Sequence, residues 1–211
     1  FMERSIIEIV EKHLNIELPH HEYEAFLMIF MEGESESEIT EYFINVENIC
    51  KKHGAIDATI PNSERAKRRL LNARENFYNA LRKFAPMELI DVVVPRNEIA
   101  GFVGKVKELS QKHEIPVIVY GHAGDGNVHL HPVCIDMDIN EWKKRLPGLM
   151  KDIYNTGSAF GGAISGEHGI GFEKKPYLIN EIDRESLDIM KKIKIAFDPN
   201  NILNPGKIFD V

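Results

Sequence analysis

Residues 120–131 read YGHAGDGNVHLH, and they follow the short apolar run IPVIV at 115–119. That run is typical of a buried strand, because it is short and rich in β-branched side chains. Asp125-Gly126 predicts a two-residue hairpin turn, since glycine readily adopts the positive φ that such a turn needs. The chain then returns as a second strand from Val128 to Val133. We therefore expect an antiparallel hairpin over 115–134.

The predicted hairpin gathers histidines on one face. With a two-residue loop, His122 lies directly opposite His129, and His131 lies two residues further along the same strand. Opposed residues have Cβ atoms roughly 4.5–5.5 Å apart, and residues two apart share a face. Two imidazoles placed in this way can share one metal ion. Cross-strand histidines are also found as plain surface polar residues, so the hairpin alone leaves both interpretations open.

A second cluster lies at 165–171, which read SGEHGIG. It supplies a carboxylate, Glu167, and another imidazole, His168. The glycines on either side allow the backbone to approach a ligand closely. A glycine-rich segment by itself can be merely a loop, but the two clusters together favour a metal or catalytic site.

The composition excludes several classes of protein. The chain has 211 residues, enough for one large domain or two small ones, and it carries a net charge of -7 without a basic stripe. Nucleic acid is therefore not an expected partner. No apolar run approaches the ~20 residues of a membrane span, so the chain is not expected to be transmembrane. Two cysteines without paired spacing, and no visible signal peptide, suit the cytoplasm.

The rest of the chain alternates between helical and strand patterns. Helical spacing predicts helices at 2–14, 36–53, 63–84, 139–154 and 185–197, and one capped by Asn97 that runs to Leu109. Strands are expected at 24–31, 55–60 and 88–94. Because one pair is a hairpin, these elements predict an α+β fold with a mainly antiparallel sheet and helices on one face. There is no GxGxxG after a strand and no P-loop, so a self-contained nucleotide-binding fold is not indicated.

Three motifs, in this order, resemble the C-terminal domain of FAD-linked oxidases of the vanillyl-alcohol-oxidase type. They are GHAGDGNVH at 121–129, SGEHGIG at 165–171, and Asp198-Pro199 followed by LNPGK at 203–207. The segment DVVVP at 91–95 fits as well. The pattern is most similar to the group of glycolate oxidase flavin subunits, D-lactate dehydrogenases and D-2-hydroxyglutarate dehydrogenases. The resemblance covers nearly the whole chain.

The resemblance implies a ferredoxin-like cap over a flavin that a separate N-terminal domain holds. Residues 1–20 would then be a helical lead-in from that FAD-binding domain, which agrees with a chain that opens directly in a helical pattern. Residues 21–155 would be the cap, or substrate, domain. Residues 156–211 would contain the glycine-rich active-site loop, a C-terminal helix and a tail that faces the flavin. The cap by itself is expected to be inactive.

The resemblance also implies roles for individual residues. It assigns His122, His129 and Glu167 as ligands of a divalent metal (zinc, manganese or iron), His168 as the base, Asn204 as a flavin contact and Arg74 as the clamp on a substrate carboxylate. Tyr78 lies one helical turn beyond Arg74 and either joins the substrate site or packs in the core. Arg74 stands in a helix rich in basic residues, so a solvated charge is its plain alternative.

The implied reaction is the FAD-dependent oxidation of a 2-hydroxy acid to the 2-oxo acid, with hydride transfer to FAD. The 2-hydroxyglutarate enzymes carry lysine where this chain has Leu89, and asparagine where it has His131. Both differences favour D-lactate or glycolate over a substrate with a second carboxylate, and they make His131 a candidate substrate contact. The resemblance also allows an iron–sulfur electron-transfer subunit as a partner, which would place the protein peripherally at a membrane.

Two other classes of function fit the same residues. Two histidines and one carboxylate suit a metal-dependent hydrolase or a non-haem iron enzyme. A non-catalytic interaction domain that kept the fold is the third possibility. A bound flavin in the full-length protein separates the first class from the oxidoreductase, and metal analysis separates the interaction domain from both.

Overall fold

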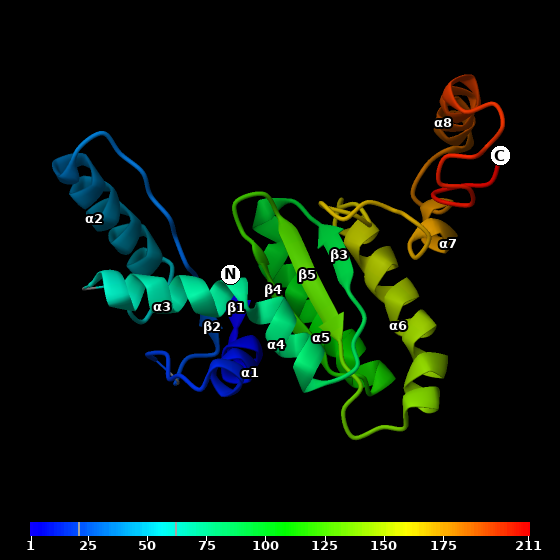
Figure 1. Ribbon diagram of the computed structural model, residues 1–211. Helices are drawn as coiled ribbons and strands as arrows, with labels where there is room; N and C mark the ends of the chain where they lie inside the picture. The colour runs from blue at the N-terminus through cyan, green and yellow to red at the C-terminus, as the bar shows by residue number, and fades with distance from the viewer. Residues whose placement is uncertain (21, 62) are drawn as a thin grey trace.

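A five-stranded antiparallel sheet lies at the centre of the computed structural model, which describes residues 1–20, 22–61 and 63–211 (Figure 1). The strand order is β2-β1-β4-β5-β3. The strands are β1 (Met2–Glu3), β2 (Ala25–Phe26), β3 (Ile90–Val93), β4 (Val117–His122) and β5 (Asn127–Pro132). The predicted α+β class and the mainly antiparallel sheet are confirmed.

The part of the sheet that carries the histidines is a split βαβ unit. Helix α5 (Ile99–His113) connects β3 to β4, and β5 lies between these two strands and pairs antiparallel with both. β3 and β4 are therefore parallel to each other, as in ferredoxin-like folds. This arrangement puts the C-terminal ends of β3 and β4 beside the first residue of β5.

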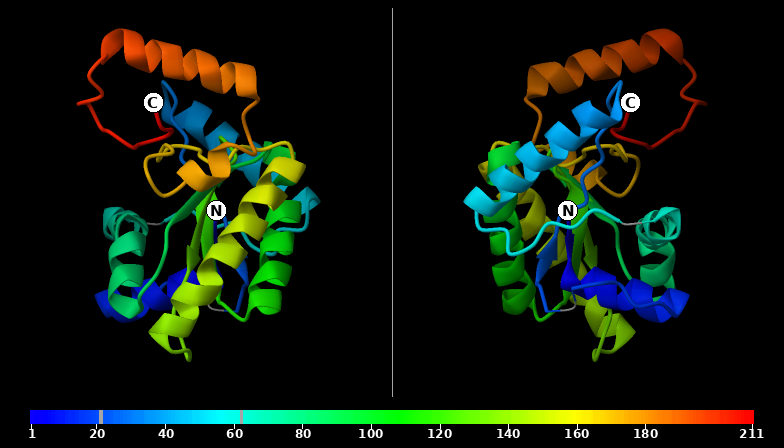
Figure 2. Two further views of the ribbon diagram at one scale, coloured as in Figure 1. Left: turned by 90° about the vertical axis from the view of Figure 1, so that its right-hand side faces the viewer. Right: turned by 90° about the vertical axis from the view of Figure 1, so that its left-hand side faces the viewer.

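Helices cover both faces of the sheet, whereas we expected them on one (Figure 2). One face packs Val119 and Leu130 against α5 and α6 (Ile139–Ala159). The opposite face packs Ile118 against α1 (Arg4–Leu14) and α4 (Phe77–Phe84). Neighbouring strand residues point to opposite faces, so an apolar run such as 115–119 needs cover on both.

The strand predicted at 24–31 is confirmed only in part, and the one predicted at 55–60 was wrong. Only Ala25–Phe26 forms a strand in the first segment, and Leu27 and Phe30 are exposed. The second segment is irregular over all of 55–60. A strand exists only where a neighbour completes its ladder of hydrogen bonds, and apolar pattern alone does not supply that neighbour. Between them, α2 (Glu36–Lys52) is helical as predicted, but it buries none of its residues.

Two of the predicted helices differ from the observed ones in more than their end points. The long helix predicted over 63–84 is two helices, α3 (Glu64–Glu75) and α4, which meet at Asn76. The side chain of Asn76 donates to the carbonyl of Asn72, a local bond that competes with regular helix. Asn97 caps no helix, because it lies inside the short 3-10 turn η1 (Arg96–Glu98) that precedes α5.

The C-terminal part holds the two remaining helices. α8 (Arg184–Phe197) agrees with the prediction, and α7 (Lys175–Leu178) was not predicted. α7 and α8 lie beyond the end of α6, with the tail folded beside them (Figure 1). Within the described part of the chain, no helix has both the length and the apolar character needed to cross a membrane.

Gly126, in the loop of the hairpin, has no room for a side chain. Its φ is +85°, and a Cβ added there would lie 2.0 Å from the carbonyl oxygen of Val94. Gly54 has a similar φ of +91° but meets no described atom within 4 Å. Positive φ costs a residue other than glycine roughly 1–2 kcal/mol. We therefore expect Gly126→Ala to lower the free energy of unfolding by clearly more than Gly54→Ala, as measured by urea denaturation. Equal losses would mean that the backbone at Val94 can move to make room for the added methyl group without loss of stability.

Candidate functional site

The histidine hairpin has a register different from the predicted one. The strands stop at His122 and resume at Asn127, and these two residues pair, so the loop has four residues instead of two. The loop is closed by the N–H of Gly126, which donates to the carbonyl of His122, and by the side chain of Asp125, which accepts from the N–H of Asn127. Tyr120, not His122, is therefore the residue opposite His129.

The register shift leaves the histidines on the same face. Side chains alternate with a period of two, so a shift of two residues preserves the face of every side chain. His122 and His129 become diagonal neighbours with ring centroids 5.1 Å apart. His122 and His129 are therefore close together as predicted, although the predicted loop length was wrong.

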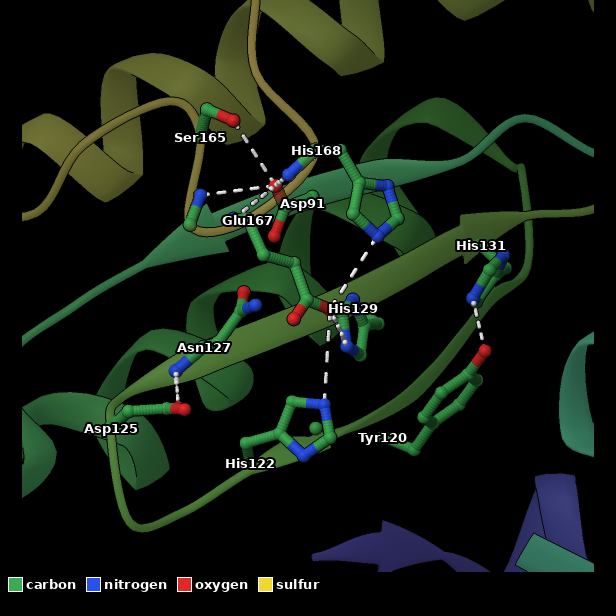
Figure 3. A network of polar contacts seen from close by, with 12 residues as sticks. Asp91, Tyr120, His122, Asp125, Asn127, His129, His131, Ser165, Glu167 and His168 are labelled. Carbon is green, nitrogen blue, oxygen red and sulfur yellow. Dashed lines mark hydrogen bonds and ion pairs between the residues drawn. The ribbon is translucent and has the colours of Figure 1, made fainter. Parts of the chain in front are cut away.

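The segment 164–171 brings Glu167 to these rings (Figure 3). Its Oε1 lies 3.1 Å from Nε2 of His129 and 3.8 Å from Nε2 of His122. His122, His129 and Glu167 form a set whose possible ligand atoms all lie within 4.8 Å of one another. Burial lowers the pKa of His129, against the opposing effect of Glu167, so its ring is neutral at pH 7.

These donors fit a divalent metal ion. Ligand atoms 2.0–2.2 Å from a tetrahedral ion lie roughly 3.3–3.6 Å from one another. The distances of 3.1 and 3.8 Å from Glu167 to the two imidazoles bracket that range. Both rings present Nε2 to the carboxylate, and a neutral imidazole nitrogen is the form that binds a metal. Two histidines and one carboxylate leave further coordination positions open for a substrate.

His168 stands beside this set and is not a member of it. Its Nε2 lies 3.5 Å from Oε1 of Glu167, and its ring centroid lies 5.5 Å from that of His129. The ring is partly exposed, so it is accessible to a small molecule. The structure therefore brings together all four residues that the resemblance assigned to metal binding and to the base.

Asp91 is the polar residue of the site to which our prediction gave no role. It is fully buried in β3, and its Oδ2 accepts the backbone N–H groups of Gly166, Glu167 and His168 at 2.9–3.0 Å. The buried Lys174 donates to the same oxygen at 3.3 Å. The one available indication was an acid within the apolar run 90–94.

Electrostatics explains why this carboxylate is stable in the core. Burial by itself would raise the pKa of Asp91, but the backbone N–H groups and the Lys174 ammonium outweigh burial and hold it at about 2. Burial lowers the pKa of Lys174, and Asp91 opposes that shift. Asp91 is thus ionised at neutral pH, and it holds the backbone that carries Glu167 and His168.

A cleft of about 370 Å³ opens beside the cluster. Its residues are Tyr78, Leu89, Tyr120, His129, Glu167 and His168. The lining thus combines an apolar and aromatic part, Tyr78, Leu89 and Tyr120, with one carboxylate and two imidazoles. Tyr78, for which the sequence left open a place in the substrate site or in the core, lines the cleft and is exposed. Burial raises the pKa of Tyr120 to about 12, so its hydroxyl stays protonated.

His131 does not line this cleft. It is fully buried, its ring stacks on Tyr120 at 5.1 Å, and its Nε2 lies 3.0 Å from the Tyr120 hydroxyl. Burial lowers the pKa of His131 to about 3, so the ring is neutral. His131 therefore contacts the cleft only indirectly, through Tyr120, which does line it.

Two other predicted residues lie outside the cleft. Arg74 is exposed near the end of α3, and Asn204 is exposed in the tail, where its φ is +49°. Neither is among the residues that line the cleft. A larger open groove of about 1050 Å³ between α1 and α3 contains none of the predicted site residues. Its charged, widely open lining makes it a weaker candidate site than the histidine cleft.

Comparison with known proteins agrees with the geometry. The family model "FAD linked oxidases, C-terminal domain" matches residues 1–208. The glycolate oxidase subunit GlcD of Bacillus subtilis is 36% identical over 99% of this chain and 44% of its own length. A D-lactate dehydrogenase of Archaeoglobus fulgidus is 38% identical over 99% of this chain and 44% of its own. A D-2-hydroxyglutarate dehydrogenase of Stutzerimonas stutzeri is 28% identical over 87% of this chain and 40% of its own.

The chain thus spans less than half the length of these relatives. No support emerges for the metal-dependent hydrolase or the non-haem iron enzyme. The match over nearly every residue shows that the chain belongs to the FAD-linked oxidases, as their C-terminal domain.

Proposed function

We propose that the protein oxidises a 2-hydroxy acid of the D-lactate or glycolate type to the 2-oxo acid, with FAD as the electron acceptor. The observation that carries this proposal is the cluster of His122, His129, Glu167 and His168, of which the last three line a small cleft. Membership of the FAD-linked oxidases, and relatives named glycolate oxidase and D-lactate dehydrogenase, support it.

In this proposal, His122, His129 and Glu167 hold a divalent ion. The ion, when bound, supplies Lewis acidity toward the substrate hydroxyl. Two imidazoles and one carboxylate suit zinc or iron, and manganese is the third candidate. The carboxylate of Glu167 is half exposed, so it faces the cleft from which the substrate would enter.

His168 is proposed as the base. Its Nε2 accepts the proton of the substrate hydroxyl, and its place outside the set of metal ligands keeps that nitrogen free for the transfer. FAD, when bound, supplies the acceptor for the α-hydrogen and its electron pair. The products are then the 2-oxo acid, reduced FAD and a protonated His168.

The apolar and aromatic part of the cleft lining favours a small monocarboxylate. Tyr78, Leu89 and Tyr120 form a surface suited to a hydrogen or a methyl group at the substrate's second carbon. No lysine or arginine lines the cleft among the described residues, so a second carboxylate has no cation to meet there. Arg74, near the end of α3 and four residues before Tyr78 of α4, remains our proposed clamp for the first carboxylate.

FAD does not fit the cleft as a whole. Ligand pockets have volumes of about 300–1,000 Å³, and a cleft of 370 Å³ has room for a small acid but not for a dinucleotide. We therefore assign FAD mainly to an N-terminal FAD-binding domain of the same protein, with Asn204 reaching the flavin from the tail. The division into a lead-in at 1–20, a cap at 21–155 and an active-site and tail segment at 156–211 belongs to this proposal. So do a cytoplasmic location, an iron–sulfur partner subunit and peripheral attachment to a membrane through that partner.

Anaerobic titration of the full-length protein tests the proposed reaction. D-Lactate or glycolate should bleach the visible absorption of the flavin, because the flavin would take up the two electrons of the substrate. D-Malate should bleach it more slowly, since its second carboxylate finds no cation in the cleft. If dithionite reduces the flavin and none of these acids does, the proposed reaction is wrong.

A further inference from the structure

Two of the buried polar atoms that have no hydrogen-bond partner among the described residues are Oδ1 of Asp91 and Nδ1 of His129. Their residues are directly opposed across β3 and β5. Opposed residues share one face of the sheet, with Cβ atoms roughly 4.5–5.5 Å apart. The Asp91 carboxylate thus lies on the same sheet face as a ring nitrogen that can donate a hydrogen bond.

The two remaining polar atoms of these side chains are already engaged. Oδ2 of Asp91 accepts three backbone N–H groups of the glycine-rich segment. Nε2 of His129 faces Glu167 at 3.1 Å and belongs to the proposed set of metal ligands. A neutral imidazole has a single N–H, so a ring that binds metal through Nε2 must carry its proton on Nδ1. A buried N–H needs an acceptor, because a buried donor without a partner destabilises the fold.

We propose that Asp91 is a positioning residue for the metal site, which accepts the Nδ1–H of His129 through Oδ1 while Oδ2 holds the segment that carries Glu167 and His168. One side chain would then orient a ligand from the hairpin and a ligand from the loop. The inference rests on the metal site of the proposed function. Metal-bound histidines commonly donate their other N–H to a carboxylate, which fixes the tautomer and the orientation of the ring.

The substitution Asp91→Asn separates the two roles. The amide oxygen of the new side chain can still accept N–H groups from the loop. Its NH2 group then faces His129 and donates to Nδ1, which forces the ring proton onto Nε2, the atom that should bind the metal. Asp91→Asn should therefore weaken Zn²⁺ binding by roughly 10–100-fold, the usual loss when the partner of a metal ligand is changed. Asp91→Glu should weaken it less, because the longer side chain keeps the acceptor.

Asp198 offers a matched control. It is also buried, and it accepts the backbone N–H groups of Ile202 and Leu203 and pairs with Lys194. It directly follows α8, which lies away from the hairpin strands β4 and β5 (Figure 1). Asp198→Asn should remove a comparable anchor without changing Zn²⁺ affinity. If both variants weaken Zn²⁺ binding equally, Asp91 acts through general stability and the inference is wrong.

Nitrogen-15 NMR of the histidine rings tests the inference on wild-type, full-length protein, even if Asp91→Asn does not fold. In the metal-free protein we expect His129 to carry a slowly exchanging proton on Nδ1, and Zn²⁺ should shift its Nε2. A proton on Nε2 in the metal-free protein overturns the inference, whether or not metal binds. If Nδ1 is protonated but no metal binds, the proposed metal site fails while the hydrogen bond to Asp91 is supported.

Discussion

Replacing His168 by alanine should lower the turnover of a 2-hydroxy acid by roughly 10²–10⁴-fold, the usual worth of a general base. The metal content should stay near that of wild type, because His168 lies outside the set of His122, His129 and Glu167. The measurement is 2-hydroxy-acid oxidation by the full-length protein with an artificial electron acceptor, together with elemental analysis of the same preparation.

His113→Ala is the control for loss of a partly buried histidine that contacts a carboxylate. Nε2 of His113 lies 2.8 Å from Asp152, on the helices α5 and α6 that cover the opposite face of the sheet. It should lower stability without a comparable loss of turnover. A His168→Ala protein that keeps full turnover, or that loses its metal, would contradict the proposed division between base and ligands.

The site was easier to predict from the sequence than the turn that supports it. His122, His129, Glu167 and His168 come together as expected, although the loop between the strands was assigned two residues too few. Alternation along a strand has a period of two, so any even error in register leaves the same side chains on the same face. An error of one residue would have placed the predicted side chain of His129 on the other face of the sheet, away from His122.

The role of Asp91 could not be predicted from its position alone. The sequence places an acid within an apolar strand, and a buried acid needs donors that compensate its charge. Those donors are backbone N–H groups some 75 residues further along the chain and Lys174, so only the tertiary structure identifies them. Asp91 is thus the main part of the site that the sequence alone did not supply.

The strand errors have one common physical cause. The runs at 24–31 and 55–60 are apolar enough for strands. Among the described residues, however, only the two residues of β2 in the first run pair with a neighbouring strand. Local pattern reports what a segment can bury, but pairing and cover depend on the rest of the chain. For the same reason, the presence of helices on both faces could not be read from the apolar run 115–119 alone.

Replacing Glu167 by glutamine should lower the metal content, which His168→Ala should leave unchanged. It should lower turnover by as much as His168→Ala or more. Three imidazoles approach Oε1 of Glu167 at 3.1–3.8 Å, and glutamine keeps the shape of that side chain while it removes the negative charge. We expect the affinity for the divalent ion to fall by more than about 100-fold, beyond the loss typical of changes around a ligand. Turnover should fall with it.

Glu173→Gln is the matched control for Glu167→Gln, since Glu173 is an exposed acid further along the same segment. It removes the same charge from the same part of the chain, but it stands outside the set of ligand atoms. It should leave both metal content and turnover near wild type. Stoichiometric metal retained by Glu167→Gln would remove Glu167 from the site, and the two hairpin histidines would then need a different third ligand.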